Sequence, residues 1–204
     1  IFNLILKYET ISKKNQVKFA NIQSYHNLVD YYEQECLLDR ALEVIDHAIT
    51  QAGYQPSLFL RKAELLLEKK ETLQALSLLD QVDVQSPGLL RTTTLRAEGL
   101  TMMGLHQQGL AILDGLRNVA HGKDLSKVYV CEALIYDNLR DFEHMFYVLK
   151  AALAEDPSNN EALSRMWYVV EYARKHEESI ALHVKIVDED PYNALAWYNI
   201  GASQ

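Results

Sequence analysis

The sequence predicts an all-α protein, an α-solenoid in which antiparallel helix pairs are stacked in series. Only 8 glycines and 4 prolines occur in 204 residues, too few for a many-turned β-sandwich but enough for helices joined by tight corners. Apolar residues recur at helical spacing, as at Tyr25, Leu28, Val29 and Tyr32. Similar segments also recur 34 residues apart, which indicates a repeated supersecondary unit.

The interval of 34 residues is kept by three sets of segments. They are 60–64 with 94–98, 41–46 with 75–80 and 109–114, and Pro157 with Pro191. Within a unit, one apolar face is followed by a short break and then by a second apolar face, so each unit holds two antiparallel helices. We therefore expect repeats at 22–55, 56–89, 90–125, 126–159 and 160–193.

The remaining segments flank these five units. Residues 1–21 are expected to form an N-terminal helix that packs on the first repeat through Ile5, Tyr8 and Ile11. Residues 194–204 are expected to be the first helix of a sixth repeat without its partner. The third unit holds two extra residues, placed at 121–124, and Asp141 and Asn193 are candidate N-caps.

These residues resemble the tetratricopeptide repeat family over positions 22–204, through the 34-residue helix pair, the closing prolines and the Trp197-x-x-Ile200-Gly201 pattern. The resemblance implies a right-handed superhelix and close helix approach at small residues. Those small positions are held by Val29, Ala41, Ala63, Ala75, Ala97, Gly109, Ala133 and Gly201. Met145, Trp167 and Ser179 depart from the pattern. We expect Trp167 to fill extra core volume; the alternative is that it pushes its helices apart.

The resemblance also implies that the first helices line an open concave groove, which suits an extended peptide or a partner helix better than a small substrate. The groove residues carried over by alignment are His26, Asp30, Glu33, Glu64, Arg91, Glu98, Leu134, Arg165, Tyr168, Tyr172 and Tyr198. The first part is acid-rich, and the last part places an arginine among tyrosines. His26 and Asp30 stand where a family subtype that grips a chaperone carboxylate has Lys and Asn, so that partner is disfavoured.

Composition excludes several other classes of protein. Lys plus Arg is 20 against 28 for Asp plus Glu, and the net charge of -8 argues against nucleic-acid binding. There is no apolar run long enough for a membrane span, and the N-terminus reads poorly as a signal peptide, so we expect a cytoplasmic protein. Cys36 and Cys131 are expected to be buried free thiols, although one disulfide between them is an alternative.

The sequence shows no catalytic motif: HExxH, GxSxG, P-loop and GxGxxG patterns are all missing. His144 beside Asp141 indicates a helix start with a satisfied histidine, and the expected helix break near Glu177 separates His176 from His183. We expect no catalytic residue, metal or cofactor.

The predicted function is a scaffold or adaptor that binds a peptide or partner protein. The alternative is a regulatory or substrate-docking arm of a larger enzyme or regulator; a helical-repeat RNA binder is a third, disfavoured class. The missing initiating Met and the unpaired last helix lead us to expect a segment of a longer protein. Self-association through the uncapped last helix is a further expectation.

Overall fold

The computed structural model describes residues 2–12 and 21–204, with only the backbone of residues 11 and 12. All regular secondary structure in these ranges is α-helical. The helices are α1 (Phe2–Ser12), α2 (Ile22–Gln34), α3 (Leu38–Ala52), α4 (Pro56–Glu68), α5 (Thr72–Gln85), α6 (Leu90–Met102), α7 (His106–Arg117), α8 (Lys123–Asn138), α9 (Phe142–Glu155), α10 (Asn160–Ala173), α11 (His176–Glu189) and α12 (Ala194–Ala202). They pack as sequential antiparallel pairs, which confirms the predicted fold class. No described helix is both long enough and apolar enough to span a bilayer.

The chain divides into two compact units, unit 1 (Ile1–Leu95) and unit 2 (Arg96–Gln204). In unit 1, α2 pairs with α3 and α4 pairs with α5, while α4 also packs on α3. Local sequence starts these helices: the side chain of Asn21 caps α2 by accepting from the Gln23 N–H, and Pro56 occupies the first turn of α4. The core of unit 1 is built from leucine, isoleucine, valine and tyrosine side chains that these helices share.

Helix α1 packs on α2 and α3 through Tyr8, which is fully buried. The Tyr8 hydroxyl lies 2.7 Å from Nδ1 of His47 in α3, and Tyr32 of α2 donates to Glu9 at 3.2 Å. Ile5 is half-buried against the same core, as expected. The rest of the predicted first helix, residues 13–20, and the side chain of Ile11 lie outside the described residues.

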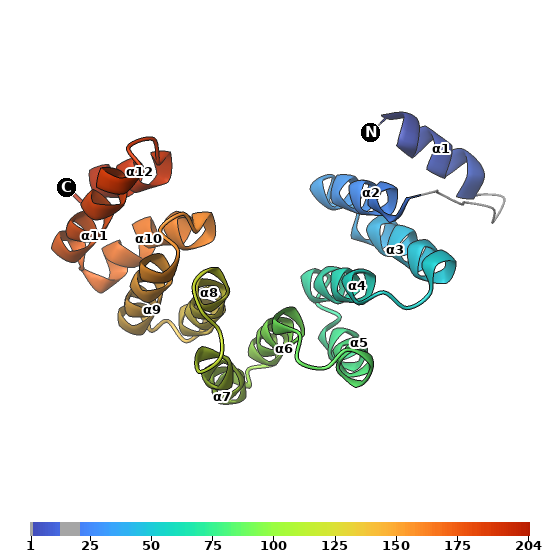
Figure 1. Ribbon diagram of the computed structural model, residues 1–204, viewed down its shortest axis with the longest axis horizontal. Coiled ribbons are helices and arrows are strands. Elements are labelled where there is room, and N and C mark those ends of the chain that lie inside the picture. Colours follow the sequence, from blue (N-terminus) through green and yellow to red (C-terminus); the bar gives the residue numbers. More distant parts are fainter. Residues whose placement is uncertain (1, 13–20) are drawn as a thin grey trace. The chain divides into compact units, whose positions relative to one another are not determined.

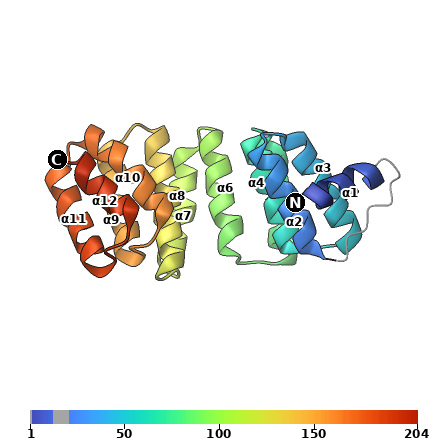
Figure 2. The same cartoon turned by 90° about the horizontal axis from the view of Figure 1, so that it is seen from above.

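Unit 2 has two layers of helices. Helices α8, α10 and α12 lie on one side, and α7, α9 and α11 on the other (Figure 1), and the second view shows α9 to α12 side by side (Figure 2). Its core is a continuous cluster of buried side chains, which includes Phe146, Leu149, Leu163, Met166 and Val169. The small residue Ala133 sits in this cluster, where its size allows close helix approach.

The turn between the two helices of a pair repeats the same backbone conformation. Positive φ values occur at Cys36, Lys70, Gly104, Arg140 and Arg174, which are 34, 34, 36 and 34 residues apart. Each turn ends its helix with a backbone bond of the Schellman type, for example from the Leu37 N–H to the Tyr32 carbonyl at 2.7 Å. The longer third interval contains the segment where the two extra residues were placed.

The structure tests several local expectations. Asp141 and Asn193 cap α9 and α12 by accepting from the His144 and Ala196 N–H groups, which confirms both predictions. Cys36 and Cys131 form no disulfide, but Cys36 is exposed at a turn, so its predicted burial is wrong, and Cys131 is half-buried. The left-handed conformation at Cys36 explains the difference, because it belongs to the turn and not to an apolar helix face. The division into five repeats with the limits given above stays a prediction.

Candidate functional site

In unit 1, α2 and α4 are the first helices of their pairs, and acidic side chains from both gather around Arg61 of α4. Its guanidinium lies 2.7 Å from Asp30, 2.5 Å from Glu33 and 3.1 Å from Glu64. Asp30 and Glu33 come from α2, about one repeat earlier in the chain, whereas Glu64 lies one turn along α4. Three of the predicted groove residues therefore meet at a single cation.

Arg91 extends this ion-pair cluster, because its Nε lies 2.9 Å from the second oxygen of Glu64. Burial acts to lower the pKa of Arg61, but the hydrogen bonds that it donates to Glu33 and Glu64 outweigh this effect, and the pKa is raised. Burial raises the pKa of the Glu68 carboxyl, and the neighbouring Glu33 adds to the rise. Four carboxylates thus face two guanidiniums, and this face of unit 1 keeps a net negative charge.

The sequence reasoning missed Arg61 as a member of this face. A signal was present, since Arg61 and Glu64 stand three residues apart and side chains at that spacing meet on a helix. The pairing with α2 had no local signal, because it joins residues 28 and 31 positions apart. His26 is half-buried on α2 near these acids in sequence, and Glu98 is exposed on the part of α6 that belongs to unit 2.

In unit 2, α10 places three predicted residues together. The Tyr168 hydroxyl lies 3.5 Å from the Met145 sulfur, and the Tyr168 and Tyr172 rings meet edge to face with centroids 6.4 Å apart. Tyr172 also stacks on Phe142 at 4.5 Å. Burial raises the pKa of the Tyr168 phenol to about 12; the carboxylate of Asp137 adds to the rise, while Arg165 opposes it.

Arg165 is the cation of this aromatic group. Its Nη2 donates to Glu161 at 3.2 Å, one helical turn away. Its Nε is buried and finds no hydrogen-bond partner among the described residues. A buried donor without an acceptor costs free energy, and burial keeps this N–H out of reach of a partner.

The neighbouring helices add exposed apolar surface to the same layer. Leu134 of α8 is half-buried, and Tyr198 of α12 is 57% exposed. Trp167 is 49% exposed, so the expectation that it fills core volume is wrong. Helix α10 packs on α9 and α12 and only lightly on α11; the alternative that Trp167 pushes its helices apart stays a prediction.

The junction of α11 and α12 is a buried polar network. His183 Nδ1 lies 2.8 Å from the Ser179 carbonyl oxygen, and its Nε2 lies 3.2 Å from the Asn199 amide nitrogen. The Asn199 amide also donates to the Leu163 carbonyl at 2.9 Å, and Ser203 donates to the Ser179 hydroxyl at 3.0 Å. These contacts require neutral His183 with its proton on Nδ1, and burial lowers the pKa of His183. The network is structural, since every ring nitrogen is used.

Other titratable groups are also engaged locally. His144 Nδ1 lies 2.8 Å from Asp141, which confirms the predicted satisfied histidine. Glu132 is buried on α8 and pairs with Arg117 at 3.4 Å. Within residues 2–12 and 21–204, no three His, Cys, Asp or Glu side chains gather in a way that would hold a metal ion.

No family model matches the sequence, and no curated protein matches it. Solved structures do match. A tetratricopeptide repeat protein of Thermus thermophilus, TTC0263, has a TM-score of 0.66 at 17% identity, over 90% of this chain and 98% of its own. MamA from Desulfovibrio magneticus RS-1 has a TM-score of 0.53 at 13% identity, over 87% of this chain and 99% of its own.

A tetratricopeptide repeat protein of Parabacteroides merdae has a TM-score of 0.50 at 12% identity, over 89% of this chain and 72% of its own. At these identities the likeness concerns the fold alone. Over most of its length, the chain has the fold of tetratricopeptide repeat proteins.

Proposed function

We propose that the chain is a protein-interaction scaffold and that the layer of α8, α10 and α12 in unit 2 binds a peptide or a segment of a partner protein. The observation that carries this proposal is the exposure of two aromatic side chains from neighbouring helices of this layer: Tyr172 at 65% and Tyr198 at 57%. Tyrosine, tryptophan and arginine are the residues most enriched at binding hot spots. A solvated helix face without a partner would carry charged or small polar groups there.

The arrangement of the rings favours binding of an extended segment. Stacking on Phe142 and the edge contact with Tyr168 hold the Tyr172 ring in place before any partner arrives. A rigid aromatic side chain loses little conformational entropy on binding, which leaves more of the contact energy for affinity. The Arg165 side chain is 27% exposed, so its guanidinium adds a cation beside these rings that a carbonyl or carboxylate oxygen of the segment can meet.

Self-association through α12 is a second candidate. It is favoured by Trp197, which is exposed beside Tyr198 although its indole N–H already donates to the Pro191 carbonyl at 2.9 Å. Light scattering over a range of protein concentrations tests it, with Trp197→Ala as the variant. A mass that stays monomeric at high concentration contradicts self-association and leaves the peptide-binding proposal intact.

The peptide-binding proposal is tested with a phage-displayed library of random 12-residue peptides. Peptides selected by the wild-type protein are synthesised with a fluorescent label, and affinity is measured by polarisation. We expect Tyr172→Ala and Arg165→Ala each to weaken binding by about thirtyfold, the loss of about 2 kcal/mol that marks a hot-spot side chain. Tyr192→Ala is the matched control, because this tyrosine is 95% exposed in the loop before α12.

The proposal fails if the selected peptides bind the Tyr172 and Arg165 variants as tightly as the wild type. It also fails if Tyr192→Ala weakens them equally, because the effect would then reflect nonspecific aromatic contact. Circular dichroism of each variant confirms that the helices are kept. Both substituted side chains lie at the surface or its edge, so little loss of fold is expected.

A further inference from the structure

Helix α12 is held in unit 2 by a small number of buried side chains. It has 9 residues and packs on α10 and α11 (Figure 2). Its buried residues are Ala196, Asn199 and Ile200, whereas Trp197 and Tyr198 are more than half exposed. A helix of this length is not stable by itself in water. We therefore expect α12 to keep its structure only while it is docked.

The polar centre of this contact is Asn199, whose amide nitrogen donates to two acceptors. One is the Leu163 carbonyl oxygen of α10 at 2.9 Å, and the other is Nε2 of His183 in α11 at 3.2 Å. The second ring nitrogen, Nδ1, lies 2.8 Å from the Ser179 carbonyl oxygen. A carbonyl oxygen only accepts, so Nδ1 carries the ring proton and a further proton can bind only at Nε2.

A proton on Nε2 leaves no orientation of the Asn199 amide that satisfies both of its neighbours. In the present orientation, the amide nitrogen would face an N–H donor. If the amide turned over, its oxygen could accept from Nε2 but would then face the Leu163 carbonyl oxygen, which is also an acceptor. The Asn199 amide oxygen is buried and has no hydrogen-bond partner in the described part of the chain. The turned nitrogen would therefore find no acceptor there in exchange.

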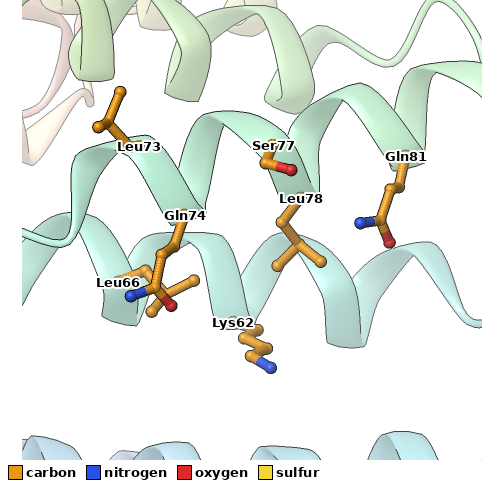
Figure 3. A pocket seen from close by; sticks show the side chains of 7 residues that line it. All are labelled: Lys62, Leu66, Leu73, Gln74, Ser77, Leu78 and Gln81. Atoms are coloured by element: carbon orange, nitrogen blue, oxygen red, sulfur yellow. The ribbon is translucent and has the colours of Figure 1, made fainter.

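Water cannot relieve this conflict, because the network is closed to solvent. Ser179 and His183 are fully buried, and Asn199 is 1% exposed. The pocket of about 400 Å³ between α4 and α5 in unit 1 is the opposite case, since the Gln74 and Gln81 side chains that line it are exposed (Figure 3). Water would solvate a new charge in that pocket, whereas in the closed network the protein has to accommodate it.

The groups that face His183 carry no charge that could stabilise the proton. They are the carbonyl and hydroxyl of Ser179 on its own helix and the Asn199 amide of α12. Helix α12 has no charged residue, and α10 contributes the Leu163 carbonyl to the same amide. Over the residues that the structure describes, no charged side chain acts on the pKa of His183: burial lowers it, and the hydrogen bond to the Ser179 carbonyl opposes this effect more weakly.

We propose that protonation of His183 releases α12 from α10 and α11, so that this junction is a latch that opens on acidification. Once α12 has left, Nε2 meets water in place of Asn199. An imidazole in water has a pKa of about 6.5, so each pH unit below that value raises the ratio of released to docked α12 by up to about tenfold. Release also takes Tyr198 away from α10, which would free a segment bound as proposed above; the latch itself does not rest on that function.

Hydrogen exchange with mass spectrometry tests the latch on the whole chain without a ligand. The protection of the backbone amides of α12 is compared with that of α9, which packs on α8 and α10, after correction for the intrinsic exchange rate at each pH. We expect α12 to be less protected than α9 at every pH. Its protection should fall by up to about tenfold between about pH 6.5 and about pH 5.5.

Two variants assign this fall to one side chain. His183→Gln keeps an oxygen that can accept from Asn199 but binds no proton, so it should abolish the fall. His176→Gln is the matched control, because His176 is a half-buried histidine at the start of the same helix. It should leave the fall unchanged.

The latch is overturned if the protection of α12 does not change with pH. It is also overturned if α12 and α9 are equally protected throughout, because α12 would then open only when unit 2 unfolds. A fall that persists in His183→Gln, or that disappears in His176→Gln, contradicts the assignment to His183. Looser docking of α12 in His183→Gln at neutral pH does not affect this test, because the comparison of α12 with α9 in the wild type needs no variant.

Discussion

Gly109 of α7 provides a sharp test of how the helices of unit 2 pack. A Cβ added at Gly109 would lie 3.2 Å from the Ala97 carbonyl oxygen, 3.1 Å from Ile135 Cδ1 and 3.4 Å from Thr101 Oγ1. The Ile135 methyl can rotate away, but the Ala97 oxygen belongs to the backbone of α6. Gly109→Ala therefore forces α7 away from α6 by a few tenths of an ångström.

The magnitude follows from two opposing effects. Replacing glycine by alanine inside a helix stabilises it by about 1 kcal/mol. Overpacking a tight contact costs about 1–3 kcal/mol, and a backbone neighbour gives the upper part of that range. We expect Gly109→Ala to lose about 1 kcal/mol overall. A Cβ added at Gly115 in the same helix meets nothing within 4 Å. Gly115→Ala should therefore raise the free energy of unfolding by close to the full difference in helix propensity, about 1 kcal/mol.

Urea unfolding monitored by circular dichroism measures both variants. The expected difference between them is about 2 kcal/mol with an unchanged dependence on urea concentration. Equal stabilisation in both variants would refute the reasoning, because it would mean that α6 and α7 do not approach at Gly109. Destabilisation of Gly115→Ala would refute the helix-propensity part.

Three further predictions concern an ion-pair cluster, a buried histidine and the left-handed turns, and each is measured by urea unfolding. Arg61→Ala leaves three carboxylates without their shared cation and should cost about 2 kcal/mol near neutral pH, whereas the more exposed Arg40→Ala should cost less than about 1 kcal/mol; equal losses would contradict this. Burial lowers the pKa of His183, so below about pH 6.5 the unfolded chain binds a proton at this residue that the folded chain does not bind. The free energy of unfolding should therefore fall as the pH drops below about 6.5. His183→Gln should make this fall smaller. Lys70→Gly should stabilise by about 0.5 kcal/mol because Lys70 has a φ of 64°, and Gly104→Ala should lose about 1 kcal/mol at the equivalent turn.

The fold was predictable from sequence because its signals are periodic. Helical spacing of apolar residues and the 34-residue interval predict paired helices, and helix pairs are what the structure contains. Caps with a side-chain oxygen, such as Asp141 and Asn193, were equally readable. The burial of Trp167 was not, because a residue in a small-residue column can turn outward when its two helices pack lightly.

The turns show why some backbone conformations cannot be predicted from the sequence. The same left-handed conformation recurs at Cys36, Lys70, Gly104, Arg140 and Arg174, yet only one of these residues is glycine. A non-glycine residue in this region costs about 1–2 kcal/mol. The Schellman bond and the packing of the next helix offset that cost, so the stacking of the pair determines the conformation and the residue type does not reveal it.

In the candidate sites too, contacts between helices decide which residues come together. An alignment of repeats places Asp30, Glu33 and Glu64 on a common face, but it does not say what neutralises them. Arg61 does so across 28 and 31 positions, close to one repeat length, where residues of adjacent first helices meet. Acidic residues that looked available to a basic partner therefore share Arg61 within the chain, although the cluster as a whole stays negatively charged. Tyr172 shows the reverse, because its contacts with Phe142 and Tyr168 orient the ring and still leave it 65% exposed. For this reason substitutions at Tyr172 are a stronger test of partner binding than substitutions in the ion-pair cluster, where loss of binding and loss of stability would coincide.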